Sequence, residues 1–373
     1  MKNETLETDL AVDEKVSYSD DSLYNINSWG ADFSFRELIN MYDDNELNKP
    51  ELQRKYVWEK VEASRFIDSI LLGLPVPSIF LAKCKDETML IVDGYQRLMT
   101  VRDFLRGTFS GDNKVFSLSN TENINQRWRG KTFQQLQASE QRKIRTTTIH
   151  SIIFEQKKPD DDTAMFQIFE RINTGGQVLK PQEIRNCVYQ GKCNDMLITL
   201  NKDENWRKVL DMPNEDARMT DMELILRYFA IKDLPKSSEK EAKQIVLMKY
   251  LNKYMGEQTR ASDEEIADKI EGFRNMIACI FKLYGKNAFR KKNKDGFQKR
   301  INQVIYDAVA IATDNALIHN SIDCNVDYIS RYKKLLDNKE FKKLIQYRTT
   351  DIINIERRIQ LASQELYGVP YEW

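Results

Sequence analysis

Histidine is almost absent from this sequence, since His150 and His319 are the only two in 373 residues. A nuclease centre of the His-Asn-His type needs histidines that lie close together, so we expect none in this chain. His150 falls in the apolar stretch 148–153, which favours a structural histidine over a metal ligand. The five cysteines are scattered and form no Cys-x-x-Cys pair, which predicts reduced core thiols rather than a zinc site or a disulfide framework.

Long apolar runs are also missing. No run approaches the ~18 residues of a membrane span, and the acidic N-terminus is unlike a basic, apolar signal peptide. We therefore expect a cytoplasmic protein with no membrane partner. Glycine (14) and proline (8) are too few for a fibrous chain, and 41% hydrophobic residues with 57 basic against 57 acidic side chains exclude a disordered one. The length allows two or more domains.

Charge is balanced overall but not locally. Residues 1–24 are acidic and lack an apolar pattern, which predicts a disordered tail. The opposite bias occurs at 286–300, where one acid, Asp295, accompanies seven basic residues: Lys286, Arg290, Lys291, Lys292, Lys294, Lys299 and Arg300. Such a run is typical either of contacts with DNA phosphates or of a solvated loop between helices.

Apolar spacing predicts an α+β fold for the first half of the chain. Residues 61–72 and 96–105 have helical spacing, and four stretches are predicted as strands: 78–83, 88–93, 115–118 and 146–154. Strand patterns end after residue 155, and helices are expected at 161–172, from Pro181 onward, and after capping boxes at Thr220–Glu223 and Ser262–Glu265. The predicted organisation is a mixed domain at 25–155, a helical continuation at 156–235 and a helical domain at 236–373.

The junction Asp93-Gly94-Tyr95-Gln96-Arg97 carries the strongest chemical signal. A strand that ends in Asp-Gly before a helix brings backbone N–H groups and the positive end of the helix dipole to one point, which favours a phosphate. Arg97 in the first turn would bind it with a bidentate guanidinium, or would form a salt bridge with a neighbour. Asp93 would hold a metal ion or a ribose hydroxyl, and Gln96 would orient a water.

Two further polar clusters stand at predicted element ends. The first is Pro50-Glu51-Leu52-Gln53-Arg54 with Trp58, and the second is Phe169-Glu170-Arg171-Ile172-Asn173-Thr174-Gly175-Gly176, followed by Glu183-Ile184-Arg185-Asn186. Arg54 either enters the same pocket as Arg97 or pairs with Glu51 or Glu59. Asn173 either closes over a ligand or belongs to a helix end.

Together, these three motifs and the segment 68–77 resemble the N-terminal domain family of GmrSD-type restriction endonucleases, marked by a DGQQR motif. The resemblance covers about residues 30–235 and implies a ParB/sulfiredoxin-like fold, with a small mixed sheet and a mostly helical C-terminal region. It implies a nucleoside triphosphate with Mg²⁺ as the ligand. The residues it assigns are Asp93, Gln96 and Arg97 for catalysis, Asp93 for the metal, and Gln53, Arg54, Gly94, Tyr95, Thr100, Arg171 and Asn173 for nucleotide binding.

The resemblance also implies a role in phage defence or modification-dependent restriction. The chain would bind or hydrolyse a nucleoside triphosphate as a sensor or switch subunit, while a separately encoded nuclease cuts. Tyr95 replaces the first Gln of the motif, and it either stacks on a base or ribose or packs against the helix. A DNA-binding module that uses residues 286–300 and 127–131 is the alternative, and a ParB-like nuclease ranks last because no paired-carboxylate motif is found.

Overall fold

The computed structural model describes residues 6, 8–9, 26–48, 58–84, 87–156, 168, 180–189, 191–294, 296–323 and 325–373. The chain forms two compact units. We call residues 20–179 and 186–188 the N-terminal unit, and residues 1–19, 180–185 and 189–373 the helical unit. The helical unit includes residues from both segments that were predicted as separate helical domains.

The N-terminal unit contains a five-stranded mixed sheet with the order β2-β8-β4-β5-β3. Its strands are β2 (Ile26–Ser34), β8 (Thr148–Gln156), β4 (Ile79–Lys83), β5 (Met89–Asp93) and β3 (Leu47–Asn48). β8 pairs antiparallel with β2 and parallel with β4, and β5 pairs antiparallel with β4 and parallel with β3. The predicted α+β class with a small mixed sheet is confirmed.

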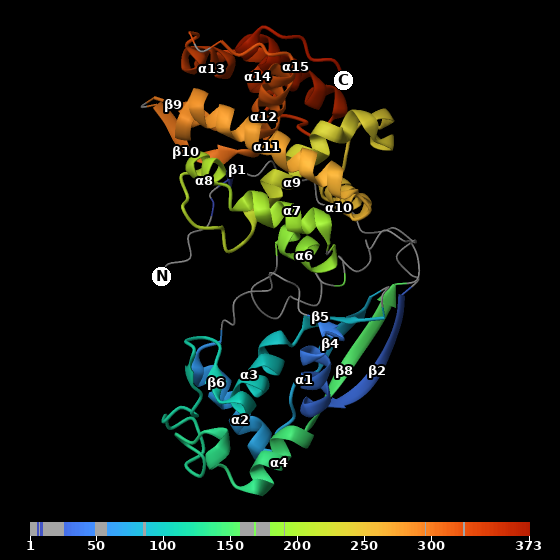
Figure 1. Ribbon diagram of the computed structural model, residues 1–373, viewed down its shortest axis with the longest axis vertical. Helices are drawn as coiled ribbons and strands as arrows, with labels where there is room; N and C mark the ends of the chain where they lie inside the picture. The colour runs from blue at the N-terminus through green and yellow to red at the C-terminus, as the bar shows by residue number, and fades with distance from the viewer. Residues whose placement is uncertain are drawn as a thin grey trace. The chain divides into compact units, whose positions relative to one another are not determined.

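Four helices lie on one side of this sheet (Figure 1): α1 (Phe35–Asp43), α2 (Lys60–Leu72), α3 (Tyr95–Arg106) and α4 (Ala138–Thr146). Alternate strand residues such as Leu81, Ile91 and Ile149 point into the same core as Ile67 of α2 and Phe104 of α3. This packing fixes the end of β5 against the start of α3, where the predicted phosphate turn lies.

One strand prediction in this unit is wrong. Residues 115–118 do not form a strand, because only Lys114–Val115 (β7) pairs, with Thr108–Phe109 (β6). Phe116 and Leu118 are apolar because they are buried in the core from a loop. The predicted helix at 161–172 lies outside the described residues, apart from the helical residue 168.

The second part of the described chain is mostly helical, as predicted. Its helices are α6 (Pro181–Val188), α7 (Lys192–Asn201), α8 (Glu204–Leu210), α9 (Thr220–Asp233), α10 (Leu247–Gln258), α11 (Asp263–Tyr284), α12 (Gln303–Ile318), α13 (Tyr328–Asp337), α14 (Lys339–Leu344) and α15 (Ile352–Tyr367). α12 is buried along most of its length and packs against α9, α11 and α15. Among the described helices, none is long and apolar enough to cross a membrane.

The helical unit also contains a small sheet that sequence patterns did not predict. β9 (Arg290–Asn293) and β10 (Gly296–Asn302) form an antiparallel pair, so the basic run at 286–300 is mainly a β-hairpin and not a loop between helices. The third strand is β1 (Thr8–Asp9), which pairs parallel with β10. β1 lies within the segment that was expected to be a disordered tail.

Of the two predicted capping boxes, one is confirmed. Ser262 and Glu265 exchange both bonds at the start of α11. At α9 the N-cap is Met219, with left-handed backbone (φ 56°), and the N–H of Thr220 donates to Asp216. The Thr220–Glu223 box is therefore wrong, because an upstream carboxylate satisfies the helix start instead.

Candidate functional site

Gly94 shapes the turn between β5 and α3. Its φ of 105° lies in the left-handed region, and a Cβ added there would lie 2.2 Å from Cγ2 of Ile79. Both facts require glycine at this position. The carbonyl of Gly94 accepts the N–H of Leu98 and so begins the helix, while glycine has no side chain to accept from the free N–H groups of the first helical turn. The turn therefore has the strand-Gly-helix geometry that the sequence predicted.

Arg97 connects three segments at this turn. Its Nη1 donates to the carbonyl oxygens of Pro77 (3.0 Å) and Ser78 (3.1 Å), and its Nη2 forms a salt bridge with Oδ2 of Asp93. The Arg97 side chain is 12% exposed and that of Asp93 is 40% exposed. The structure thus shows the salt bridge that the sequence left as the alternative for Arg97. The Nε–H of Arg97 and Oδ1 of Asp93 have no partner among the described residues.

Gln96 contacts the chain that leads into α2. Its side-chain carbonyl accepts the backbone N–H of Trp58 at 3.4 Å, and the Trp58 ring packs edge-on against Phe66. This contact connects Gln96 to the chain that enters α2, and its role in orienting a water stays a prediction.

Tyr95 and Thr100 point into the domain. Tyr95 is half-buried against the core, and its side chain forms a hydrogen bond with that of Tyr42 on α1. Burial is the main cause that raises the pKa of Tyr95 well above its usual value, and the neighbouring Tyr42 raises it further. The sequence left open whether Tyr95 stacks on a ligand or packs, and the structure shows packing. Thr100 is fully buried and its hydroxyl donates to the carbonyl of Gln96, so a ligand contact of Thr100 stays a prediction.

The predicted partners Gln53, Arg54, Arg171 and Asn173 lie outside the described residues, so their convergence with Arg97 stays a prediction. The described residues also contain no group of three or more His, Cys, Asp or Glu side chains placed to share a metal ion. Mg²⁺ prefers one or two carboxylates together with phosphate oxygens. Asp93 has one oxygen on Arg97 and the other without a partner in the described part of the chain, and it fits such a shared site.

Glu183 and Arg185, from the third sequence motif, are structural. Glu183 accepts the N–H of Lys180 at 2.6 Å and pairs with Arg218 at 3.0 Å. Arg185 is 1% exposed and donates to Gln182, Glu223 and Asn252. Sequence analysis assigned no role to these two residues, and the structure shows that they bind the first part of α6 to other residues of the helical unit.

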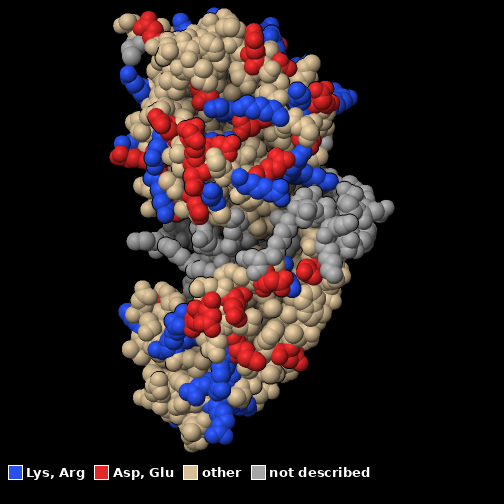
Figure 2. Space-filling view, turned by 45° about the vertical axis from the view of Figure 1, so that its right-hand side comes forward, with Lys and Arg blue, Asp and Glu red and all other residues tan. Residues whose placement is uncertain are grey.

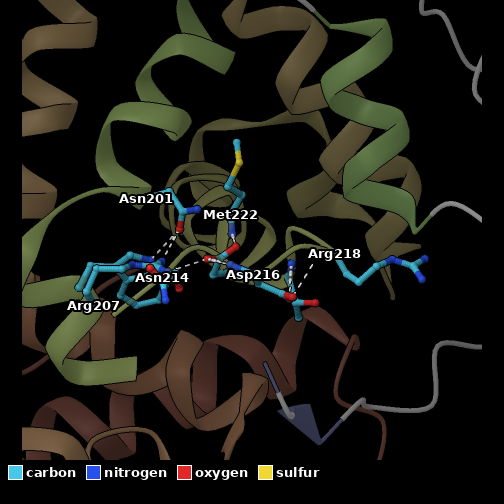
Figure 3. Close-up of polar contacts among 9 residues, drawn as sticks. Asn201, Arg207, Asn214, Asp216, Arg218 and Met222 are labelled. Atoms are coloured by element: carbon cyan, nitrogen blue, oxygen red, sulfur yellow. Dashed lines mark hydrogen bonds and ion pairs between the residues drawn. The ribbon is translucent and has the colours of Figure 1, made fainter. Parts of the chain in front are cut away.

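A buried polar network that the sequence did not reveal lies beside these contacts (Figure 3). Asp221, fully buried, accepts from Nη1 of Arg207 (2.9 Å) and from the backbone N–H groups of Asp216 and Met222. Arg207 also donates to Asn201 and to the carbonyl of Asn214. A single carboxylate therefore holds the start of α9 against α8.

The basic residues at 127–131, which the DNA-binding alternative used, are largely engaged within the domain. Trp128 is buried and its Nε1 donates to Asp68 at 2.5 Å. Arg129 donates to the carbonyls of Ile124 and Glu122. Arg127 is more exposed and pairs with Glu140. This set is therefore a structural loop, which anchors to α2 through Asp68.

In the β9–β10 hairpin, some basic residues are engaged within the fold and others are exposed. Arg290 is buried and donates to the carbonyls of Val209 and Leu210, and burial lowers its pKa. Lys292 pairs with Asp337. Lys294 and Lys299 are exposed without a partner among the described residues. On the face shown in Figure 2, basic and acidic side chains are interspersed over the helical unit. Positive charge that could attract a polyanion is therefore confined to small areas of this face and does not cover it.

Comparison with known families shows which kind of domain contains the β5–α3 turn. Residues 35–190 match the model of the GmrSD restriction endonuclease N-terminal domain. These residues form a domain of that family. The match contains β3, β4, β5, β8 and α1 to α4, and with them the Asp93–Arg97 turn. No curated protein matches the chain. The GmrSD domain indicates a component of a restriction system, in agreement with the resemblance seen in the motifs.

Proposed function

We propose that the GmrSD domain of this chain binds a nucleoside triphosphate at the β5–α3 turn, as the sensor subunit of a phage-defence restriction system. The observation that carries the proposal is the start of α3. There Gly94 leaves the helix N-terminus without a side-chain cap, and Arg97 stands in the first turn. Helix N-termini with an adjacent arginine are well suited to phosphate.

The contacts of Arg97 indicate how a phosphate would be received. Nη1 stays on the carbonyls of Pro77 and Ser78, which holds the guanidinium in place. Nε–H and Nη2–H lie on one edge of the group, and a phosphate would bind that edge in competition with Asp93. Released from Arg97, Asp93 would share Mg²⁺ with phosphate oxygens, and the ion would neutralise part of the triphosphate charge. Hydrolysis and cutting by a separately encoded nuclease are further parts of this proposal.

Replacing Arg97 with methionine is expected to weaken binding of the triphosphate by about 2–4 kcal/mol, because the guanidinium edge is lost. Isothermal titration calorimetry against each nucleoside triphosphate, with Mg²⁺, measures this. Arg106→Met is the matched control, since Arg106 lies in the last turn of the same helix and pairs with Asp43. Equal affinity of Arg97→Met and wild type would contradict the proposal.

A second variant separates a binding defect from a folding defect. Asp93→Asn removes the intramolecular partner of Arg97 without shortening the side chain. We expect this variant to bind triphosphate more tightly than wild type in EDTA and to gain less from added Mg²⁺. If the Mg²⁺ dependence of binding is the same in both proteins, Asp93 does not hold the ion.

DNA is the second candidate partner, and the exposed β9–β10 hairpin is the observation that favours it. The double variant Lys294→Glu/Lys299→Glu should reduce the slope of log affinity for duplex DNA against log salt by about one for each lysine. Lys236→Glu/Lys240→Glu, which changes the same charge outside the hairpin, serves as the control. Fluorescence anisotropy at several salt concentrations gives the slope. An unchanged slope in the hairpin variant would exclude the hairpin as the contact.

A further inference from the structure

Two arginines share one aspartate inside the helical unit. Asp307 of α12 is fully buried, and Arg227 of α9 binds it side-on, with Nε at 3.2 Å from Oδ1 and Nη2 at 2.7 Å from Oδ2. Arg358 of α15, 1% exposed, reaches the same Oδ2 only at 3.4 Å through Nη2. The better contacts of Asp307 thus belong to Arg227, and Arg358 has only a long, shared contact with an acid.

Among the described residues, Arg358 has no other acidic partner. Its Nη1 donates to the carbonyl of Thr349 at 2.5 Å, a neutral acceptor. Burial lowers the pKa of Arg358 to about 10, which still leaves it charged at neutral pH. A buried cation with an incomplete counter-charge is costly, and proteins normally complete the pairing of such a group.

Buried donor groups without acceptors occur on Arg358 itself and on α12. Nε of Arg358, Nε2 of Gln303 and Oη of Tyr306 are buried and have no hydrogen-bond partner among the described residues. Gln303 uses its amide oxygen on Arg227, so its unpartnered end is the donating NH₂. All three groups can donate, and two of them, on Gln303 and Tyr306, come from the first turn of α12. Buried donors of this kind call for an acceptor that the described residues do not provide.

We propose that the core of the helical unit binds one small monovalent inorganic anion, such as chloride, against the Nε edge of Arg358 between α12 and α15. Nε–H and one Nη2–H of a guanidinium are parallel, so this edge presents two donors in the same direction. An anion there accepts from Nε–H and completes the counter-charge of Arg358. A water would satisfy the donor but would leave the charge incompletely paired, which is why we favour the ion.

Thermal and urea unfolding of the full chain test this, with potassium chloride replaced by potassium gluconate at constant ionic strength. Gluconate is too large for a buried site. Above the dissociation constant, we expect the ratio of folded to unfolded protein to rise about tenfold for each tenfold rise in chloride. Arg358→Met should abolish this dependence. Arg331→Met, which removes a partly buried arginine that donates to the carbonyl of Leu366, should retain it.

A direct measurement keeps the proposal testable if Arg358→Met does not fold. Crystals of the wild-type chain grown in bromide should show an anomalous peak within hydrogen-bond distance of Nε of Arg358. A water at that position, or stability of the wild type that is independent of chloride, would overturn the proposal. Chloride dependence that persists in Arg358→Met would also overturn it, because the effect would then arise elsewhere.

Discussion

Replacing Asp221 with asparagine is expected to lower the free energy of unfolding by about 3–5 kcal/mol. The carboxylate is fully buried, and it accepts from Arg207 and from the backbone N–H groups of Asp216 and Met222. Asparagine keeps the shape but removes the charge, so Arg207 is left buried with only neutral acceptors. At least one of the N–H donors that now face a carboxylate oxygen would face an NH₂ group instead. Urea unfolding followed by far-ultraviolet circular dichroism measures the change.

The control for Asp221 is an exposed pair in the same unit. Arg357 and Glu340 form two contacts, at 2.7 and 3.1 Å, but both side chains are 48% exposed. Water screens this pair, so Glu340→Gln should cost less than about 1 kcal/mol. If the two variants lose similar stability, the Asp221 network does not hold α9 in the way described.

Replacing Gly94 with alanine is expected to destabilise the N-terminal unit by about 2–5 kcal/mol. Two costs add. The left-handed backbone is unfavourable for a residue with a Cβ, and that Cβ would overlap Ile79 at 2.2 Å. Ile79 lies on β4, next to β5, so relief requires movement of the sheet rather than of a flexible side chain.

Gly107 separates these two costs. It ends the same helix with a φ of 82°, but nothing lies within 4 Å of an added Cβ. Gly107→Ala should therefore show only the backbone cost, about 1–2 kcal/mol. The difference between the two variants in urea midpoints reports the close approach to Ile79. Equal losses would show that Gly94 is needed for its backbone alone.

The sequence predicted the turn at Gly94 well because its causes are local. A strand that ends in Asp-Gly before a helical pattern leaves few alternatives, and β4, β5, α2 and α3 occur within one or two residues of the expected bounds. The partners of Arg97 were less predictable. The carbonyls of Pro77 and Ser78 lie 20 and 19 residues away, and only the packing of β4 beside β5 brings them to the guanidinium.

Contacts between distant segments explain the larger differences. The Thr220 box fails because Asp216 reaches the helix start first. The β9–β10 hairpin has too few apolar residues for a strand pattern, since its buried side chains include Arg290, which neighbouring carbonyls satisfy. Asp68 is similar: no pattern in α2 shows that it will accept from Trp128 in a loop 60 residues away. Buried polar groups of this kind follow the fold and cannot be read from periodicity.

The pairing of β1 with β10 has a consequence for the order in which the protein matures. Thr8 and Asp9 are synthesised before the strands and helices of the N-terminal unit, whereas their partners Ile301 and Asn302 follow only after that whole unit has been made. At usual synthesis rates this interval is about 15–60 s. The N-terminal unit can fold during that time, whereas the sheet of the helical unit cannot close. Until β10 has been made, β1 is unpaired, and a chaperone or a neighbouring chain can bind it most readily during this interval.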